Sequence, residues 1–202
     1  MAQPRRAGVG LARLVCGLLA AVALTDAAVN SSDIGHFFSF FTIESNILGC
    51  VVLLVGGLAD PDSRGWSIVR AAATLYLTIT GIVYAALLAH QDLGLISPWV
   101  NDVLHRAMPL LMLADWVLFE PWPTTSRSAA LSWLAGPLAF LVYSLIRGPI
   151  VHWYPYPFLD PRRRGGYTHV ALTCVILAIG MALLALIISW IGDRRSAAWG
   201  PR

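Results

Sequence analysis

The stretch YTHVALTCVILAIGMALLALIISWI, residues 167–191, decides the fold class because it holds no charged residue over a length that can span a bilayer. The whole 202-residue chain has the same character: 57% of its residues are hydrophobic, 12% are charged, and the mean hydropathy is +0.69. So few polar groups cannot cover a soluble surface. The sequence therefore predicts an all-α polytopic membrane protein, and it excludes a DNA-binding protein and a secreted disulfide-rich protein.

Five further apolar segments precede this stretch, and together they predict one domain over residues 1–202, a bundle of six transmembrane helices. The expected spans are 8–28, 36–59, 66–90, 99–119, 129–151 and 167–191. The first span follows Arg5 and Arg6, as a signal peptide would, but a retained helix is expected because five further spans follow. Gly136-Pro137 and Gly148-Pro149 should break the fifth span.

Arginine counting predicts the orientation, because all fourteen basic residues are arginine. With both termini cytoplasmic, nine arginines lie on the inner face: Arg5, Arg6, Arg13, Arg64, Arg70, Arg127, Arg194, Arg195 and Arg202. Four lie on the outer face, Arg147 and the run 162–164, and Arg106 is left out because it falls within a span. The arginine-only composition, rich in Ala, Gly, Pro and Trp, favours a bacterial source. The expected location is the plasma membrane.

The expected partners are the lipid bilayer and a lipid-like substrate, with no nucleic acid. The net charge of +3 is explained by arginines at the ends of cytoplasmic loops. Cys16, Cys50 and Cys174 all lie in apolar stretches without a CxxC pair, so they are expected to pack as free thiols. The function that the sequence favours, developed below, is expected to need neither a cofactor nor a metal.

All five histidines should lie at one face of the membrane, and they are His36, His90, His105, His152 and His169. Two interpretations stay open for them. The rings could simply suit the interface, where they reach water. They could instead form a functional polar layer that binds metal or haem, although the sequence lacks the HxxxH and HExxH spacings.

The first segment with chemical potential is FFSFFTIESN, residues 37–46. Residues three and four apart share one helix face, which here carries small and polar residues: Ser39, Thr42, Ser45, Asn46 and Gly49. This stripe should face the bundle interior because lipid cannot satisfy its hydrogen bonds. Ordinary packing of helices through small residues would produce the same pattern. Glu44 should point away from the stripe.

The second segment is NDVLHRAMP, residues 101–109. Ionisable residues within a span are functional candidates by default. Asn101 and Asp102 lie four and three residues before His105, so either could orient its imidazole. Asp102 and Arg106, at i and i+4, could instead pair with each other. Pro109 lacks an N–H and should leave the carbonyl of His105 free.

Thr42 and His105 should lie at matching depths, each one to two turns in from the same face. A threonine hydroxyl becomes a nucleophile when a histidine within hydrogen-bond reach removes its proton. The sequence therefore predicts a Thr–His dyad in a pocket that opens to one leaflet. The alternatives are a metal or haem protein and a structural membrane protein, whereas the lack of repeated halves argues against a transporter.

The chain resembles the androgen-induced membrane proteins and their bacterial six-span relatives. The resemblance rests on the Thr42 segment, on His105 with Pro109, and on YPFLD at residues 156–160, and their order and spacing cover nearly the whole chain. Animal members of that family are intramembrane threonine hydrolases that cleave fatty-acid esters of hydroxy fatty acids with one threonine and one histidine. The resemblance implies that Thr42 and His105 have these roles, although the neighbouring residues differ from the animal pattern.

The activity that the resemblance implies would pass through an acyl-enzyme on Thr42. Asn46 or a backbone N–H would then stabilise the oxyanion, and Asn101 or Asp102 would hold the imidazole. The turn that begins at Tyr156 would cap the mouth of the pocket. An aromatic anchor at the membrane interface would explain the same turn.

Overall fold

A computed structural model describes residues 3–59, 61, 63–89, 97–119 and 127–199, and every regular element in these ranges is helical. The α-helices are α1 (Gln3–Val29), α2 (Ile34–Phe37), α3 (Phe41–Leu58), α4 (Arg64–Val83), α5 (Pro98–Asp102), α6 (Met108–Leu118), α7 (Arg127–Ser132), α8 (Ala135–Val151) and α9 (Gly166–Trp199). Three short elements complete them: the π-helical turns η1 (Tyr84–Leu88) and η2 (Val103–Ala107), and the 3₁₀ turn η3 (Pro157–Leu159).

By length and composition, five helices can cross a membrane, as expected of an all-α membrane protein: Ala7–Val29, Phe41–Leu58, Arg64–Leu88, Ala129–Val151 and Gly166–Arg195. The predicted fourth span is a sixth helix, in which α5, η2 and α6 run on without a break. It is not one of the five apolar helices, because it carries Asp102, Arg106 and Asp115. The predicted end of the third span, His90, lies outside the described residues.

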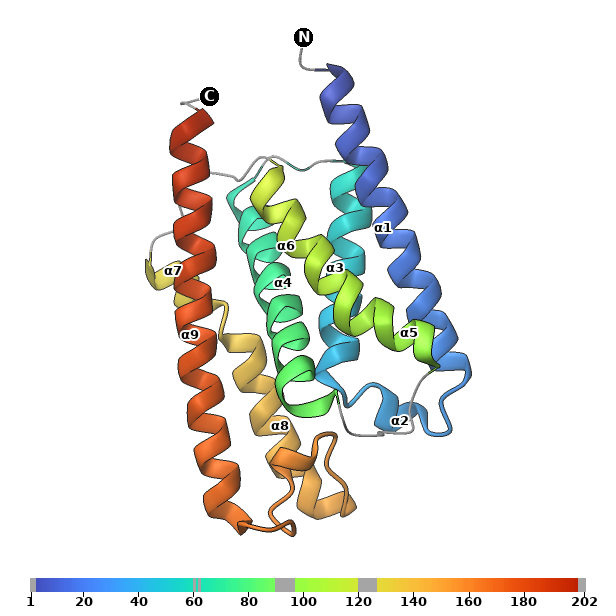
Figure 1. Cartoon of the computed structure of the whole chain (residues 1–202), viewed down its shortest axis with the longest axis vertical. Helices are drawn as coiled ribbons and strands as arrows, with labels where there is room; N and C mark the ends of the chain where they lie inside the picture. The colour runs from blue at the N-terminus through green and yellow to red at the C-terminus, as the bar shows by residue number, and fades with distance from the viewer. Residues whose placement is uncertain (1–2, 60, 62, 90–96, 120–126, 200–202) are drawn as a thin grey trace.

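The helices alternate in direction through the bundle (Figure 1). The chain runs one way along α1, α4 and α7–α8, and the opposite way along α3, α5–α6 and α9, so the start of α1 and the end of α9 lie at the same end. Small residues allow α1 and α3 to pack closely, since a Cβ atom on Gly57 would lie 2.8 Å from the carbonyl oxygen of Gly10.

A buried charged cluster connects α1, α4 and α6. Asp115 lies between two arginines: its Oδ1 is 2.7 Å from Nε of Arg13, and its Oδ2 is 2.8 Å from Nε of Arg70. All three side chains are less than a tenth exposed. Arg13 and Arg70 were counted above as inner-face arginines. Both lie inside the bundle as partners of a carboxylate, so they do not report the orientation.

The second predicted span does not begin as one helix at His36. The short α2 ends at Phe37, the chain becomes extended at Phe40 (φ −94°, ψ 128°), and α3 starts at Phe41. Thr42 is therefore the second residue of a helix and does not lie one to two turns into one. Its backbone N–H belongs to the first turn, where no carbonyl of the same helix can accept it.

The fifth and sixth spans also differ from their predicted limits. The fifth breaks at Trp133 and Leu134, just before the predicted Gly136-Pro137, because proline fits the first turn of the helix that follows. Pro149 lies inside α8 and does not end it. The helix of the predicted sixth span, α9, continues to Trp199, beyond the predicted end at residue 191.

Candidate functional site

Thr42 and His105 meet inside the bundle. Oγ1 of Thr42 lies 3.2 Å from Nε2 of His105, although 63 residues separate them in the chain. The two residues are 6% and 8% exposed, so water reaches neither freely. The prediction that the polar stripe faces the interior is confirmed, because its members are all buried: Ser39, which precedes α3, and Thr42, Ser45, Asn46 and Gly49 on α3. Glu44 is exposed, as expected.

The imidazole of His105 is held in one tautomer. Its Nδ1 lies 3.2 Å from the backbone carbonyl oxygen of Asn101. A carbonyl oxygen only accepts hydrogen bonds, so Nδ1 carries the hydrogen and Nε2 keeps its lone pair. The hydroxyl of Thr42 therefore donates to Nε2. This is the arrangement that a general base needs before it removes a proton.

The two residues predicted to orient His105 behave differently. Asn101 orients the ring through its backbone carbonyl, while its side-chain amide donates to Oη of Tyr84 over 2.6 Å. Asp102 does not orient His105: its carboxylate pairs with Arg106, and both side chains are more than half exposed. The alternative given above for Asp102 and Arg106 is therefore correct.

Tyr84 belongs to the site, although sequence reasoning missed it. Its ring stacks on the imidazole of His105, with 4.3 Å between ring centroids and 26° between planes. Its hydroxyl accepts the amide of Asn101, so the phenol touches both the base and the residue that holds the base. A tyrosine near the end of a span is typical of an interfacial anchor, and this left no signal in the sequence.

The π-helical turn η2 and Pro109 together expose a carbonyl beside the dyad. The N–H of Met108 bonds the carbonyl of Val103, five residues back. One residue further on, the equivalent donor for the carbonyl of Leu104 is the nitrogen of Pro109, which has no hydrogen. The prediction that Pro109 frees a backbone carbonyl is therefore correct, but the predicted residue is not. The π-helical register moves the freed group from His105 to Leu104.

Asn46 satisfies that carbonyl. Its Nδ2 donates to the carbonyl oxygen of Leu104 over 3.0 Å and to that of Thr42 over 2.8 Å. Both amide hydrogens are engaged, which ties the first turn of α3 to the turn that carries His105. Asn46 therefore positions the dyad, and its amide has no hydrogen left for the oxyanion role considered above.

Tyr156 lies against the start of α3. Its Oη accepts the backbone N–H of Thr42 over 3.2 Å and lies 3.3 Å from Oγ1 of the same residue. Because the threonine hydroxyl donates to His105, the phenol must donate to Oγ1. Burial raises the pKa of the Tyr156 phenol above its usual range, so the group stays neutral and keeps a hydrogen to donate.

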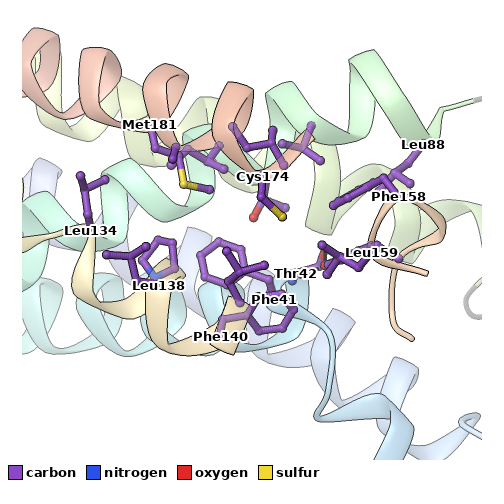
Figure 2. Close-up of a pocket in the computed structure, with 18 residues that line it drawn as sticks. Phe41, Thr42, Leu88, Leu134, Leu138, Phe140, Phe158, Leu159, Cys174 and Met181 are labelled. Carbon is purple, nitrogen blue, oxygen red and sulfur yellow. Dashed lines mark hydrogen bonds between the residues drawn. The ribbon is translucent and has the colours of Figure 1, made fainter. Parts of the chain in front are cut away.

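An elongated cavity passes Thr42 and runs between α4, α8 and α9, with lining residues on both sides of Thr42 (Figure 2). It contains about 800 Å³ of space between atoms, with the open mouth included. Most of its lining side chains are apolar, and Thr42, Thr80, Tyr156 and Cys174 supply the polar atoms and the thiol. Such a lining suits a mainly hydrocarbon ligand with one polar group near Thr42.

The other described histidines, His36, His152 and His169, each have surroundings that differ from those of His105. His36 stacks on Trp153 with 3.9 Å between ring centroids, while His152 and His169 are exposed. His90 lies outside the described residues. Within the described ranges, no three His, Cys, Asp or Glu side chains come together as metal ligands would.

The site thus combines the start of α3, the turn η2, the end of α4 and the segment that leads into η3. It holds a hydroxyl, an imidazole in a fixed tautomer, a neutral phenol and an apolar cavity. No protein-family model, curated protein or solved structure matches the chain.

Proposed function

We propose that the protein is an integral-membrane hydrolase of lipid carboxylic esters, with Thr42 as nucleophile and His105 as general base. The observation that carries this proposal is the 3.2 Å contact between Oγ1 and Nε2, at the polar part of an apolar cavity. The carbonyl of Asn101 supports it, because it leaves the lone pair of Nε2 facing the hydroxyl. The resemblance to the androgen-induced membrane proteins makes fatty-acid esters of hydroxy fatty acids one candidate substrate.

The reaction has two halves. Nε2 of His105 takes the hydroxyl proton as Oγ1 of Thr42 attacks the ester carbonyl, and the resulting imidazolium gives that proton to the alkoxide that leaves. The acyl group is then bound to Oγ1, and the alcohol departs. In the second half, His105 removes a proton from water, the hydroxide attacks the acyl carbon, and Thr42 regains its proton as the fatty acid is released.

Tyr156 is placed to stabilise the oxyanion. Its oxygen accepts the N–H of Thr42, so its own hydrogen is free to turn from Oγ1 towards a carbonyl oxygen that carries developing charge. The oxygen also lies at the start of α3, where the helix dipole favours negative charge. The phenol therefore takes the role that the sequence left open between Asn46 and a backbone N–H.

Tyr156→Phe should lower kcat by about 10²- to 10³-fold and change KM little, because one oxyanion donor is lost and the ring is kept. The measurement is steady-state ester hydrolysis in detergent micelles. Tyr143→Phe is the matched control, since it removes a phenol that contacts Ser39 outside the dyad. Equal activities in the two variants would remove Tyr156 from the mechanism.

We also infer that the helix over residues 98–118 is the sixth membrane crossing. Its charges have partners: Asp115 lies between Arg13 and Arg70, and Asp102 pairs with Arg106. The start of α1 and the end of α9 lie at one end of the bundle, as expected for an even number of crossings between them (Figure 1). A plasma-membrane location with cytoplasmic termini stays a prediction.

The test combines turnover with covalent trapping. Purified protein in detergent should hydrolyse p-nitrophenyl laurate, and an alkyl fluorophosphonate should modify Oγ1 of Thr42 with loss of fluoride, as seen by peptide mass spectrometry. Thr42→Val has nearly the same shape without the hydroxyl and should show neither reaction. Modification of another residue, or equal turnover by Thr42→Val, would overturn the proposal.

A further inference from the structure

The exposed part of the cavity lining comes from α8 and α9. Two of the 18 lining residues in Figure 2 are exposed: Leu138, at 52%, on α8, and Ala178 on α9. At the end near η3, by contrast, Leu88 and Leu159 are buried and Phe158 is half-buried. Side chains that line a cavity and are also exposed lie at its rim. The rim formed by Leu138 and Ala178 is called the side portal below.

The side portal lies at the depth of the hydrocarbon core. Ala178 is 12 residues from the start of α9 at Gly166, about 18 Å along the helix. Leu138 is 13 residues from the end of α8 at Val151, about 20 Å along that helix. Both residues therefore lie near the middle of apolar helices that can cross a membrane about 30 Å thick. At this depth the portal faces lipid chains and not water.

Helix α9 is loosely packed where it forms the portal. From residue 171 to residue 184 no residue of this helix is buried, and a Cβ atom on Gly180 would meet no side chain and no other helix within 4 Å. The helix is held further on, where Ala185 and Ile188 are buried and Nε1 of Trp116 donates to the carbonyl of Ile188 over 3.0 Å. Few buried contacts oppose a movement of the middle of α9 away from α8, so the portal can widen for a lipid chain.

The rim and the lining behind it consist of hydrocarbon, from Leu138, Leu177, Ala178 and Met181. A charged group cannot pass such a rim, because lipid and leucine offer it neither water nor a counter-ion. An uncharged alkyl chain passes without that cost and gains contact with the apolar walls of the cavity.

Resting on the proposed hydrolase function, we propose that lipid esters enter the cavity from the bilayer through the side portal, with an uncharged chain first. The cavity then leads the ester to Thr42 without a passage through water. The substrates are therefore esters dissolved in the membrane. Any charged group that they carry stays at the interface while the alkyl chain and the ester group enter.

The first test follows a lipid chain and requires no hydrolysis. Thr42→Val, which should be inactive, is reconstituted in vesicles of phosphatidylcholine with a diazirine in the middle of one acyl chain, and peptide mass spectrometry locates the labels formed by light. Ile79 and Thr80 line the cavity from α4 and are 5% exposed, so a label there reports a chain that has entered. Val22, 59% exposed on α1, reports contact with bulk lipid. The label on Ile79 and Thr80 divided by that on Val22 is called the cavity-to-lipid ratio.

Narrowing and widening the rim should change this ratio in opposite directions. Ala178→Trp should lower it by about fivefold or more, because a smaller fraction of the molecules then has an open portal. Leu138→Ala removes a rim side chain and should raise it. Ile179→Trp is the matched control, because Ile179 is 58% exposed on α9 and does not line the cavity.

Hydrolysis in vesicles separates this inference from the proposed function. With Thr42 intact, Ala178→Trp should lower kcat/KM for p-nitrophenyl palmitate by about fivefold or more, and Ile179→Trp should leave it within about twofold. A cavity-to-lipid ratio that falls in Ala178→Trp, without hydrolysis of any ester by wild type, would overturn the hydrolase function and leave the portal. Hydrolysis by wild type, with equal ratios in Ala178→Trp, Leu138→Ala and Ile179→Trp, would overturn the side portal alone, as would palmitate hydrolysis that Ala178→Trp leaves unchanged.

Discussion

Replacing His105 with glutamine should lower kcat for ester hydrolysis by roughly 10⁴-fold while the bundle stays folded. Glutamine fills similar space and can still bond the carbonyl of Asn101, but its amide nitrogen has no lone pair that can take a proton. Thr42 then keeps its proton and remains a weak nucleophile. The measurement is single-turnover hydrolysis, with the thermal midpoint of the purified variant as the test of folding.

The double variant sharpens this prediction. If the hydroxyl and the imidazole act as one unit, Thr42→Val, His105→Gln and the combination should all show the same residual rate, because removing either partner already removes the reaction. Separate contributions would instead multiply, and the double variant would then be far slower than either single variant. That second outcome would contradict a dyad and would leave two independent binding residues.

The contact between Thr42 and His105 could be predicted because it rests on periodicity and depth. The stripe of α3 identifies the face that Thr42 shares, and the histidine lies at a similar depth on another helix. The details around His105 could not be predicted in this way. The π-helical register of η2 shifts which carbonyl Pro109 frees, and a register shift of this kind leaves no pattern in a single sequence.

The start of α3 was missed for a different reason. The stretch from Phe37 to Phe41 contains no glycine or proline, so nothing in it indicated that the helix breaks at Phe40. That break has a chemical consequence, since it leaves the N–H of Thr42 without a helical acceptor and brings Tyr156 to it. Tyr156 itself lies in a connecting segment, where sequence periodicity does not report which way a side chain points.

The second large effect concerns the buried charges. Asp115 pairs with both Arg13 and Arg70, which come from two other helices. Nη2 of Arg70 also donates to the backbone carbonyl of Asp115 over 2.8 Å. In a bundle surrounded by lipid, an arginine that loses its carboxylate cannot recover the solvation that water would give it. The cluster therefore fixes the relative positions of α1, α4 and α6.

Asp115→Leu should lower the free energy of unfolding by about 3–5 kcal/mol, because it leaves two buried guanidinium groups without their carboxylate. The measurement is unfolding by sodium dodecyl sulfate from mixed micelles, followed by circular dichroism. Asp102→Leu is the matched control: its partner Arg106 is exposed, and an exposed pair contributes only about 0–1 kcal/mol. Replacing the whole cluster, in Arg13→Met/Arg70→Met/Asp115→Leu, should restore most of the lost stability, since all three charges of the cluster are then removed together. A triple variant weaker than Asp115→Leu would mean that the two arginines stabilise the bundle through contacts other than those with Asp115.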